Sequence, residues 1–396
     1  MTRYRAARLH LLAALLLPAT AAGGPRNDLA ASVAVDVAGD TNVYNGRGPD
    51  LVTRVSPSVF WKLTDERDLV QVNYDLGLWW YAEGKAKNSV NHHALLIAER
   101  KITRRLTLRV DDELVRAEDP GFVLRPGIVA PQTGILDNVA EASATYLLSR
   151  RLELGGAYLY RTTRFDPQPA GDPPLHDGDE QDGDLSLTLH ASRLDDVRAD
   201  NRVQYLSIDG HGLAWTEGPA IGWRRQLLRS LELRIDGGPL IYGSLDGSRL
   251  VPGSQITAIT WRGTGVLRFY SRRAFAALSV LRDILSGTGA GEVDWAEYLT
   301  LRGGWKPVPW IDLRGVFGLF ANGPAPSGAR TYDGVTVDAI AEFRVAQWAS
   351  VAGYYSFRWQ EAHEVGPLPD LTRHVAGVRI NFMYGAAIKP EKPEGH

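Results

Sequence analysis

The stretch Leu69-Val70-Gln71-Val72-Asn73-Tyr74-Asp75-Leu76-Gly77-Leu78-Trp79-Trp80 alternates apolar and polar side chains. One set of alternate positions carries Val70, Val72, Tyr74, Leu76, Leu78 and Trp80. The other carries Gln71, Asn73, Asp75 and Gly77. Because successive side chains of a strand point to opposite faces, the pattern predicts a β-strand with one apolar and one polar face. Its length suits a tilted strand that crosses a bilayer, which needs about 9–11 residues.

The same alternation returns along the chain, for example in residues 231–236, 311–317 and 335–344. A soluble half-buried strand would show it once or twice. We therefore predict an all-β fold, a transmembrane antiparallel β-barrel of about 18 strands. The expected strands lie near 29–38, 51–63, 69–81, 91–102, 106–116, 138–148, 152–163, 185–194, 197–208, 213–227, 231–242, 256–270, 274–284, 292–306, 311–320, 332–345, 349–360 and 371–384.

Two of these strands and one proline depart from the simple pattern. The alternation does not decide which face of 91–102 and of 274–284 is apolar. Pro57 lies inside an expected strand and removes one ladder donor, so we expect a β-bulge there.

The connections alternate between two lengths. Short turns such as 65–67 and 149–151 alternate with longer loops rich in Gly, Pro and Asp, such as 120–137, 165–184 and 243–255. Transmembrane barrels have short periplasmic turns and long extracellular loops. An even number of strands then places both termini in the periplasm.

The eleven tryptophans favour the ends of the expected strands. Transmembrane barrels place aromatic girdles at both membrane interfaces. Ordinary packing in a soluble core would not sort these residues to strand ends. The residues beside short turns are Trp61, Trp223, Trp305, Trp310 and Trp348. Those near long loops are Trp79, Trp80, Trp215, Trp295 and Trp359, and Trp261 alone falls in mid-strand.

The first residues have the plan of a secretory signal. Arg3, Arg5 and Arg8 precede the apolar run 11–17 and small residues near Ala21 and Ala22, so we expect cleavage there. The predicted organisation is a cleaved signal peptide at 1–22, the barrel at 23–384 and a periplasmic tail at 385–396. The absence of cysteine excludes a disulfide framework. The small net charge of −2 gives no reason to expect nucleic acid as a partner.

Several diffuse features resemble the porin superfamily of Gram-negative outer membranes. They are Gly39-Asp40-Thr41-Asn42-Val43, Val55-Ser56-Pro57, and arginine turns that lead into alternating strands at 104–108 and 150–154. In length and strand count the chain is similar to the 18-stranded exopolysaccharide secretion barrels of Wzx/Wzy-type pathways. That resemblance implies an integral outer-membrane location, a polysaccharide substrate and a periplasmic polysaccharide export protein as partner.

The last expected strand, with Gly377, Ile380 and Phe382, resembles the signal by which the barrel-insertion machinery recognises its clients. Val375 departs from that signal, because a polar residue is usual there. The tail 385–396 departs too, because such chains usually end on an aromatic residue. The partners implied are the insertion machinery, outer-membrane lipid and lipopolysaccharide.

The predicted lumen face carries charges of both signs. A mixed wall suits either a polar solute or an acidic, hydroxyl-rich polymer, and it also suits ion pairs that only keep the wall polar. The candidate pore-lining residues are Asp75, Arg109, Asp111, Glu113, Glu232, Arg234, Asp236, Arg262, Arg268, Asp312, Arg314, Glu342, Arg344 and Arg358.

No catalytic, metal or cofactor site is expected. The histidines lack partners in register for nucleophilic catalysis, and no Gly-x-Ser-x-Gly element occurs. His92 and His93 point to opposite faces and cannot share an ion. The acidic segment 177–184 departs from the calcium-loop spacing and is interpreted as a solvated loop.

Three functions remain open at this stage. The main hypothesis is a conduit for exopolysaccharide secretion. The alternatives are a general or small-solute diffusion porin and a structural barrel with no transport role. An enzyme is not expected.

Overall fold

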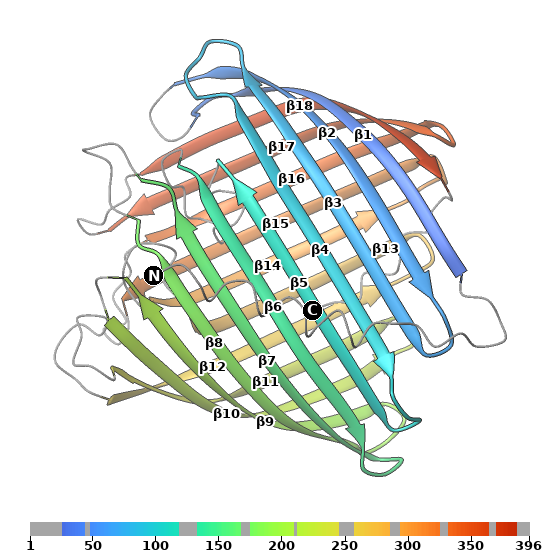
Figure 1. Ribbon diagram of the computed structural model, residues 1–396, viewed down its shortest axis with the longest axis vertical. Helices are drawn as coiled ribbons and strands as arrows, with labels where there is room; N and C mark the ends of the chain where they lie inside the picture. Colours follow the sequence, from blue (N-terminus) through green and yellow to red (C-terminus); the bar gives the residue numbers. More distant parts are fainter. Residues whose placement is uncertain are drawn as a thin grey trace, which may run out of the picture.

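The computed structural model describes residues 26–43, 48–118, 133–167, 175–209, 212–244, 257–285, 294–324, 332–363 and 370–385. Eighteen antiparallel strands form one closed sheet in which each strand pairs with its neighbours in sequence (Figure 1). They are β1 Arg26–Asp40, β2 Asp50–Thr64, β3 Asp68–Tyr81, β4 Ser89–Lys101, β5 Leu106–Ala117, β6 Ile135–Leu147, β7 Leu152–Phe165, β8 Gly178–His190, β9 Asp195–Ile208, β10 Gly212–Leu228, β11 Leu231–Ser244, β12 Thr257–Tyr270, β13 Ala274–Leu285, β14 Asp294–Trp305, β15 Ile311–Pro324, β16 Tyr332–Ala346, β17 Ala349–Ala362 and β18 Leu371–Gly385.

The first and last strands close the barrel. β1 pairs with β2 on one side and with β18 on the other, in a register that sets Asp36 opposite Arg379. The side chain of Arg373 donates two hydrogen bonds to Asp40 across this joint, at 3.0 Å from Nε and 2.5 Å from Nη2 to Oδ2. Closure satisfies the backbone groups that an open edge would leave unpaired in lipid.

The two faces of the wall differ in polarity. Along β1, Val33 and Val37 point outward and are 38% and 43% exposed, whereas Asp36 and Asp40 point inward and are 3% and 1% exposed. The same exposed apolar face continues around the barrel, for example at Ile235. Only lipid satisfies such a surface, so this is a transmembrane barrel. No helix in the described residues is long and apolar enough to cross a membrane.

The predicted fold class is confirmed, with eighteen strands. The expected bulge at Pro57 is wrong, because the register of β2 against β3 is unshifted across Ser56 and Pro57, where the ladder only lapses. Register shifts occur instead between Gln226 and Leu228 and between Arg344 and Ala346. The expected cleavage site lies outside the described residues, and so does the expected tail 385–396 except for Gly385, which is the last residue of β18.

Two further expectations change in detail. The acidic segment 177–184, interpreted as a loop, forms the start of β8 from Gly178 onward, and this part pairs with both β7 and β9. Trp79 and Trp295 are not girdle residues, because each is 6% exposed. Trp79 faces the lumen under the guanidinium of Arg54, at 4.2 Å from the ring centroid.

The wall is irregular between β12 and β13. Their ladder ends at the pair of Gly263 with Arg282, which leaves Thr257–Arg262 of β12 unpaired on that side. Beyond this point Ile284 and Trp295 have outward parity but are 2% and 6% exposed. They cluster with inward-facing side chains of β9 and β11, including Leu240. The long-loop ends of β13 and β14 therefore bend inward against β9–β11.

The register can be tested by chemical labelling, since the chain has no cysteine of its own. We expect a water-soluble maleimide to label Arg314→Cys, whose side chain faces the lumen, and to leave Leu313→Cys in lipid unlabelled. The measurement is the mass shift of each variant reconstituted in vesicles. Labelling of Leu313→Cys alone would overturn the assigned faces.

The closing ion pair makes a stability prediction. Asp40→Asn leaves the guanidinium of Arg373 without its buried counter-ion, and such a loss costs about 3–5 kcal/mol. Urea unfolding of the reconstituted barrel measures this loss. Asp28→Asn is the control, because its partner Arg26 is 77% exposed and the change should cost less than about 1 kcal/mol. Equal losses in the two variants would contradict a role in closure.

Candidate lumen site

The register places all fourteen candidate residues on the inward face. Arg234 and Asp236 of β11 share this face with Arg262 of β12, because Asp236 pairs with Thr264 in the inward rows. Asp312 and Arg314 likewise share it with Glu342, and Arg314 lies 3.2 Å from that carboxylate. Their role in lining a pore stays a prediction.

The candidates fall into separate groups around the wall. Asp75 and Glu113 flank His93, whose Nδ1 lies 3.3 Å from Asp75 and whose Nε2 lies 2.8 Å from Glu113. This group lines a lumen pocket of about 510 Å³ with Arg54 and Arg379. Several other candidates pair with a charge on their own or an adjacent strand, as Arg109 does with Asp111 at 2.7 Å, Arg268 with Glu232 at 3.8 Å and Arg358 with Asp338 at 2.9 Å. Among the residues that the structure describes, Arg344 forms no ion pair.

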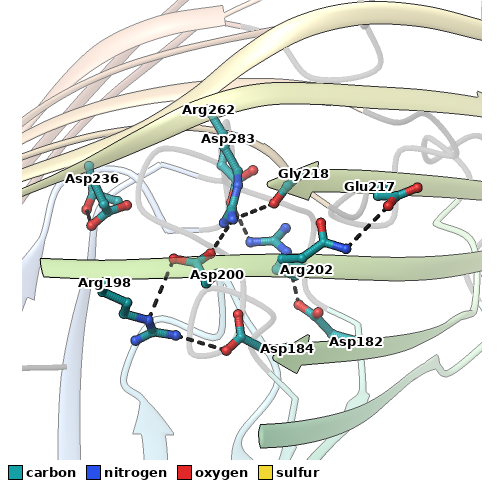
Figure 2. Close-up of polar contacts among 12 residues, drawn as sticks. Asp182, Asp184, Arg198, Asp200, Arg202, Glu217, Gly218, Asp236, Arg262 and Asp283 are labelled. Carbon is teal, nitrogen blue, oxygen red and sulfur yellow. Dashed lines mark hydrogen bonds and ion pairs between the residues drawn. The ribbon is translucent and has the colours of Figure 1, made fainter. Parts of the chain in front are cut away.

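A further group of charges lies on β8–β13 (Figure 2). Arg198 bridges Asp184, at 2.9 Å, and Asp200, at 3.6 Å. Arg262 donates from Nη2 to Asp200 at 2.5 Å and to the carbonyl oxygen of Gly218 at 2.6 Å. Arginine and carboxylate thus alternate along this wall. We call these residues, together with Asp182, Arg202 and Asp283, the β8–β13 charge ladder.

Small residues allow the side chain of Arg262 to reach across two strands along the inner face of the wall. Asp200 lies on β9, and β10 and β11 separate it from Arg262 on β12. The inward positions on β10 opposite this path are Gly218, Ala220 and Gly222. A Cβ atom at Gly218 would lie 2.9 Å from Nε of Arg262. A larger residue there would displace the guanidinium.

An ion pair also joins strands that are far apart in the sheet. Nη1 of Arg202 on β9 lies 2.7 Å from Asp283 on β13, and its Nε lies 3.2 Å from Asp182 on β8. The three side chains are 11–18% exposed. This contact is possible because the end of β13 bends inward. It narrows the lumen at the long-loop end.

Toward the short-turn end, the charge ladder opens into a pocket of about 420 Å³. Arg224 and Arg234 are the more accessible cations here, at 55% and 44% side-chain exposure. Carboxylates of Asp196 and Asp236 lie beside them, at 3.7 and 3.8 Å. The pocket can form hydrogen bonds with solutes that carry hydroxyl, carboxylate or amine groups.

Sequence reasoning missed several members of the ladder, namely Asp182, Asp184, Arg198, Asp200, Arg202 and Asp283. Their strand alternation was the available signal, since Arg198, Asp200 and Arg202 occupy every second position of β9. Among the described residues, no group of three or more His, Asp or Glu side chains is arranged to hold a metal ion. His92 and His93 do face opposite sides, and His92 contacts the outward Tyr74.

Solved structures share this architecture. OccK2 (OpdF) of Pseudomonas aeruginosa, in complex with glucuronate, has a TM-score of 0.50 at 7% identity, covering 91% of this chain and 98% of that chain. OccAB4 of Acinetobacter baumannii has a TM-score of 0.47 at 8% identity, covering 92% and 99%. OpdO of P. aeruginosa has a TM-score of 0.46 at 9% identity, covering 91% and 97%.

The likeness to OccK2 (OpdF) bears on the fold of this chain. At these identities the likeness concerns the fold alone. The comparisons give no link to exopolysaccharide secretion. No protein-family model matches the chain, and no curated protein is similar to it in sequence.

The cross-lumen contact makes a prediction about conductance. Asp283→Asn should weaken the hold of Arg202 on the end of β13, widen the lumen and raise single-channel conductance by roughly half. Planar-bilayer recording measures this change. Asp338→Asn is the matched control, because its ion pair with Arg358, at 2.9 Å, joins adjacent strands and does not cross the lumen. A similar conductance in the wild type and both variants would contradict the narrowing.

Proposed function

We propose that the chain is an outer-membrane channel for the diffusion of small, polar solutes, in the manner of OprD/Occ-type porins. The observation that carries this proposal is the contact between Arg202 and Asp283, at 2.7 Å, which joins β9 to β13 inside the lumen. A narrowed lumen favours small solutes over a sliding polymer.

The lining supports a solute of mixed polarity. In the pocket beside the charge ladder, Arg234 and Asp236 typify the pairing of each cation with a carboxylate. A paired wall offers many hydrogen bonds and no strong site, as conduction requires, because a tight site would stall transport. Hydroxylated molecules with a carboxylate or amine group match this wall. Glucuronate, bound in the OccK2 structure, is a suitable probe.

The outer-membrane location of this proposal rests on the outward apolar face and the closed sheet. We place the short turns, such as 65–67, in the periplasm and the long connections outside the cell. Both ends of the described chain, Arg26 and Gly385, then lie on the periplasmic side. We still expect outer-membrane lipid and lipopolysaccharide as the surroundings of the barrel. The barrel-insertion machinery remains its expected assembly partner.

Exopolysaccharide secretion remains the second candidate. The favouring observation is the strand number, since 18 strands enclose a lumen wide enough for a hydrated chain unless the wall or loops fold inward. The inward bend of β13 and β14 counts against it. A periplasmic export protein as partner belongs to this candidate and not to the solute channel.

The test of the solute channel is flux through reconstituted vesicles. We expect glucuronate to permeate, and we expect the double variant Arg224→Ser/Arg234→Ser to lower anion permeability relative to cation permeability by about twofold. Arg273→Ser is the control, because Arg273 lies in a short turn and its guanidinium bonds to the carbonyl of Pro307. Unchanged selectivity in the double variant would count against solute contact with this pocket.

Deleting the gene for this chain in its native cell distinguishes the solute channel from exopolysaccharide secretion. A solute channel predicts slower uptake of small polar solutes with normal surface polysaccharide. Loss of surface polymer, restored by the wild type but not by a variant with a blocked lumen, would establish secretion and overturn the solute channel.

A further inference from the structure

The short turns at one end of the barrel are rich in arginine. Five of them follow β4, β6, β8, β10 and β12, and together they carry eight arginines and no acidic residue. We call them the arginine turns; they are residues 102–105, 148–151, 191–194, 229–230 and 271–273. In the long connections at the other end of the barrel, acidic residues outnumber basic ones. Positive charge is therefore concentrated at the short-turn end, and the lumen pocket does not account for it.

A hydroxyl group folds four of the five arginine turns. Its oxygen accepts a hydrogen bond from a backbone N–H group two or three residues further on, as Thr103 does from Leu106 at 3.0 Å. Ser149, Ser192 and Ser271 act in the same way. Because the hydroxyl group holds the turn, the guanidinium groups are not needed to fold it.

The arginines of these turns are exposed and almost all unpaired. Within the part of the chain that the structure describes, one of the eight has a side-chain partner: Arg273 donates to the carbonyl oxygen of Pro307 at 3.1 Å. The lumen differs, since Arg198 and Arg202 each have two carboxylates nearby. The positive charge of the arginine turns is therefore available to a partner outside the chain.

The arginine turns lie at the level of the membrane interface. Tyr146 and Phe269 are exposed on the outer face near the ends of β6 and β12, and aromatic side chains at strand ends mark the interface in such barrels. Arg150 and Arg272 follow them by four and three residues, which is about 8–10 Å at about 3.3 Å per residue on a tilted strand. The head-group layer is about 5–8 Å thick, so a flexible arginine side chain reaches the lipid phosphates.

Apolar side chains in the same turns hold them against the membrane. Ile102, Leu148 and Leu194 are 41%, 44% and 52% exposed. Exposed apolar residues beside cations are typical of segments that lie in the membrane interface. A lipid head group is therefore the partner that the arginine turns meet first.

The chemistry of the turns favours an anionic head group. A guanidinium group binds phosphate oxygens through two parallel hydrogen bonds. The phosphate of phosphatidylethanolamine is offset by the ammonium group of the same lipid, whereas phosphatidylglycerol has no such cation. Attraction to an anionic membrane surface is about fivefold for each arginine near it.

We propose that the arginine turns bind anionic phospholipids of the periplasmic leaflet through their phosphate groups. This inference rests on the placement of the short turns in the periplasm that belongs to the proposed function. Lipopolysaccharide occupies the opposite leaflet, at the end of the barrel where acidic residues prevail in the connections. The contact fixes the depth of the short-turn end in the bilayer and does not depend on which solute the channel carries.

The test compares the lipids found at the two ends of the reconstituted barrel. A bimane label on Leu148→Cys reports on lipid beside an arginine turn, since the chain has no cysteine of its own. From quenching by brominated lipids in mixed vesicles, we expect phosphatidylglycerol to bind there about fivefold more strongly than phosphatidylethanolamine. The matched reporter is Leu114→Cys toward the long-loop end of β5, which is 40% exposed. The neighbouring Arg116 is paired with Asp166 at 2.6 Å, so the two lipids should bind equally at this position.

A pair of variants tests the arginines themselves. With the label on Leu148→Cys, Arg150→Gln/Arg151→Gln should lower the preference for phosphatidylglycerol to about twofold or less. The matched control is Lys85→Gln/Lys87→Gln, which removes two exposed cations from the long-loop end and should keep the full preference. Heat-modifiable migration in gels shows that each variant is folded.

Three results would overturn the assignment. They are equal binding of the two phospholipids beside Leu148, a full preference in Arg150→Gln/Arg151→Gln, and displacement of phosphatidylglycerol by lipid A at equal concentration. The placement in the periplasm has its own test, because a polymer-bound maleimide too large for the lumen should label Arg229→Cys only in permeabilised cells. Labelling in intact cells would overturn that placement. Absence of glucuronate flux would overturn the solute channel alone and leave the lipid preference unchanged.

Discussion

Every backbone polar group in the hydrocarbon layer must find a partner within the protein, and the rest of this structure depends on that constraint. It explains why β1 pairs on both sides, with β2 and with β18. The joint also carries a buried ion pair, that of Asp40 with Arg373. The two strands of the joint are about as far apart in the chain as the sequence allows, so a specific polar contact selects their register where no turn can do so.

The hydrogen-bonded ladder between β12 and β13 is incomplete, and this interruption affects both the inner and the outer face of the barrel. Where the ladder of β12 and β13 stops at Gly263 and Arg282, β13 is free to bend away from β12. On the inside, the bend brings Asp283 to Arg202 and packs Ile284 beside Leu240. On the outside, it leaves a hollow that Trp261 borders. One interruption of hydrogen bonding thus accounts for both the inward bend and the outer hollow.

The sequence predicted local features well because a period of two is a local signal. It gave the strands, and it sorted residues such as Arg234 and Leu233 to opposite faces. It failed where composition imitates another class of structure. The Asp- and Gly-rich segment 177–184 has the composition of a loop, but cross-strand ion pairs such as that of Arg198 with Asp184 stabilise it as a strand. Leu95 and Ile97 hid the parity of β4, because they face inward opposite Asn73 and Gln71.

Contacts across the lumen could not be predicted from alternation. Arg202 and Asp283 are 81 residues apart, and their meeting depends on where a distant ladder ends. The same limit applied to Arg262 and Asp200, whose contact requires a small residue at Gly218 on the intervening strand β10. Alternation identifies which residues face the lumen, whereas the inward bend decides which of them meet.

The proposed channel requires that a lumen with so many ionisable groups conduct, and the pairing of charges meets this requirement. An isolated guanidinium in a confined lumen would hold an anion strongly, because the low local dielectric strengthens the attraction. Arg198 and Arg202 each have two carboxylates within 3.6 Å, so a passing solute meets a partly neutralised wall. Such a wall exchanges hydrogen bonds with the solute without retaining it. In the proposed channel, the more exposed Arg224 and Arg234 determine which charge on a solute is preferred, because their guanidinium groups remain the most open to water in the pocket.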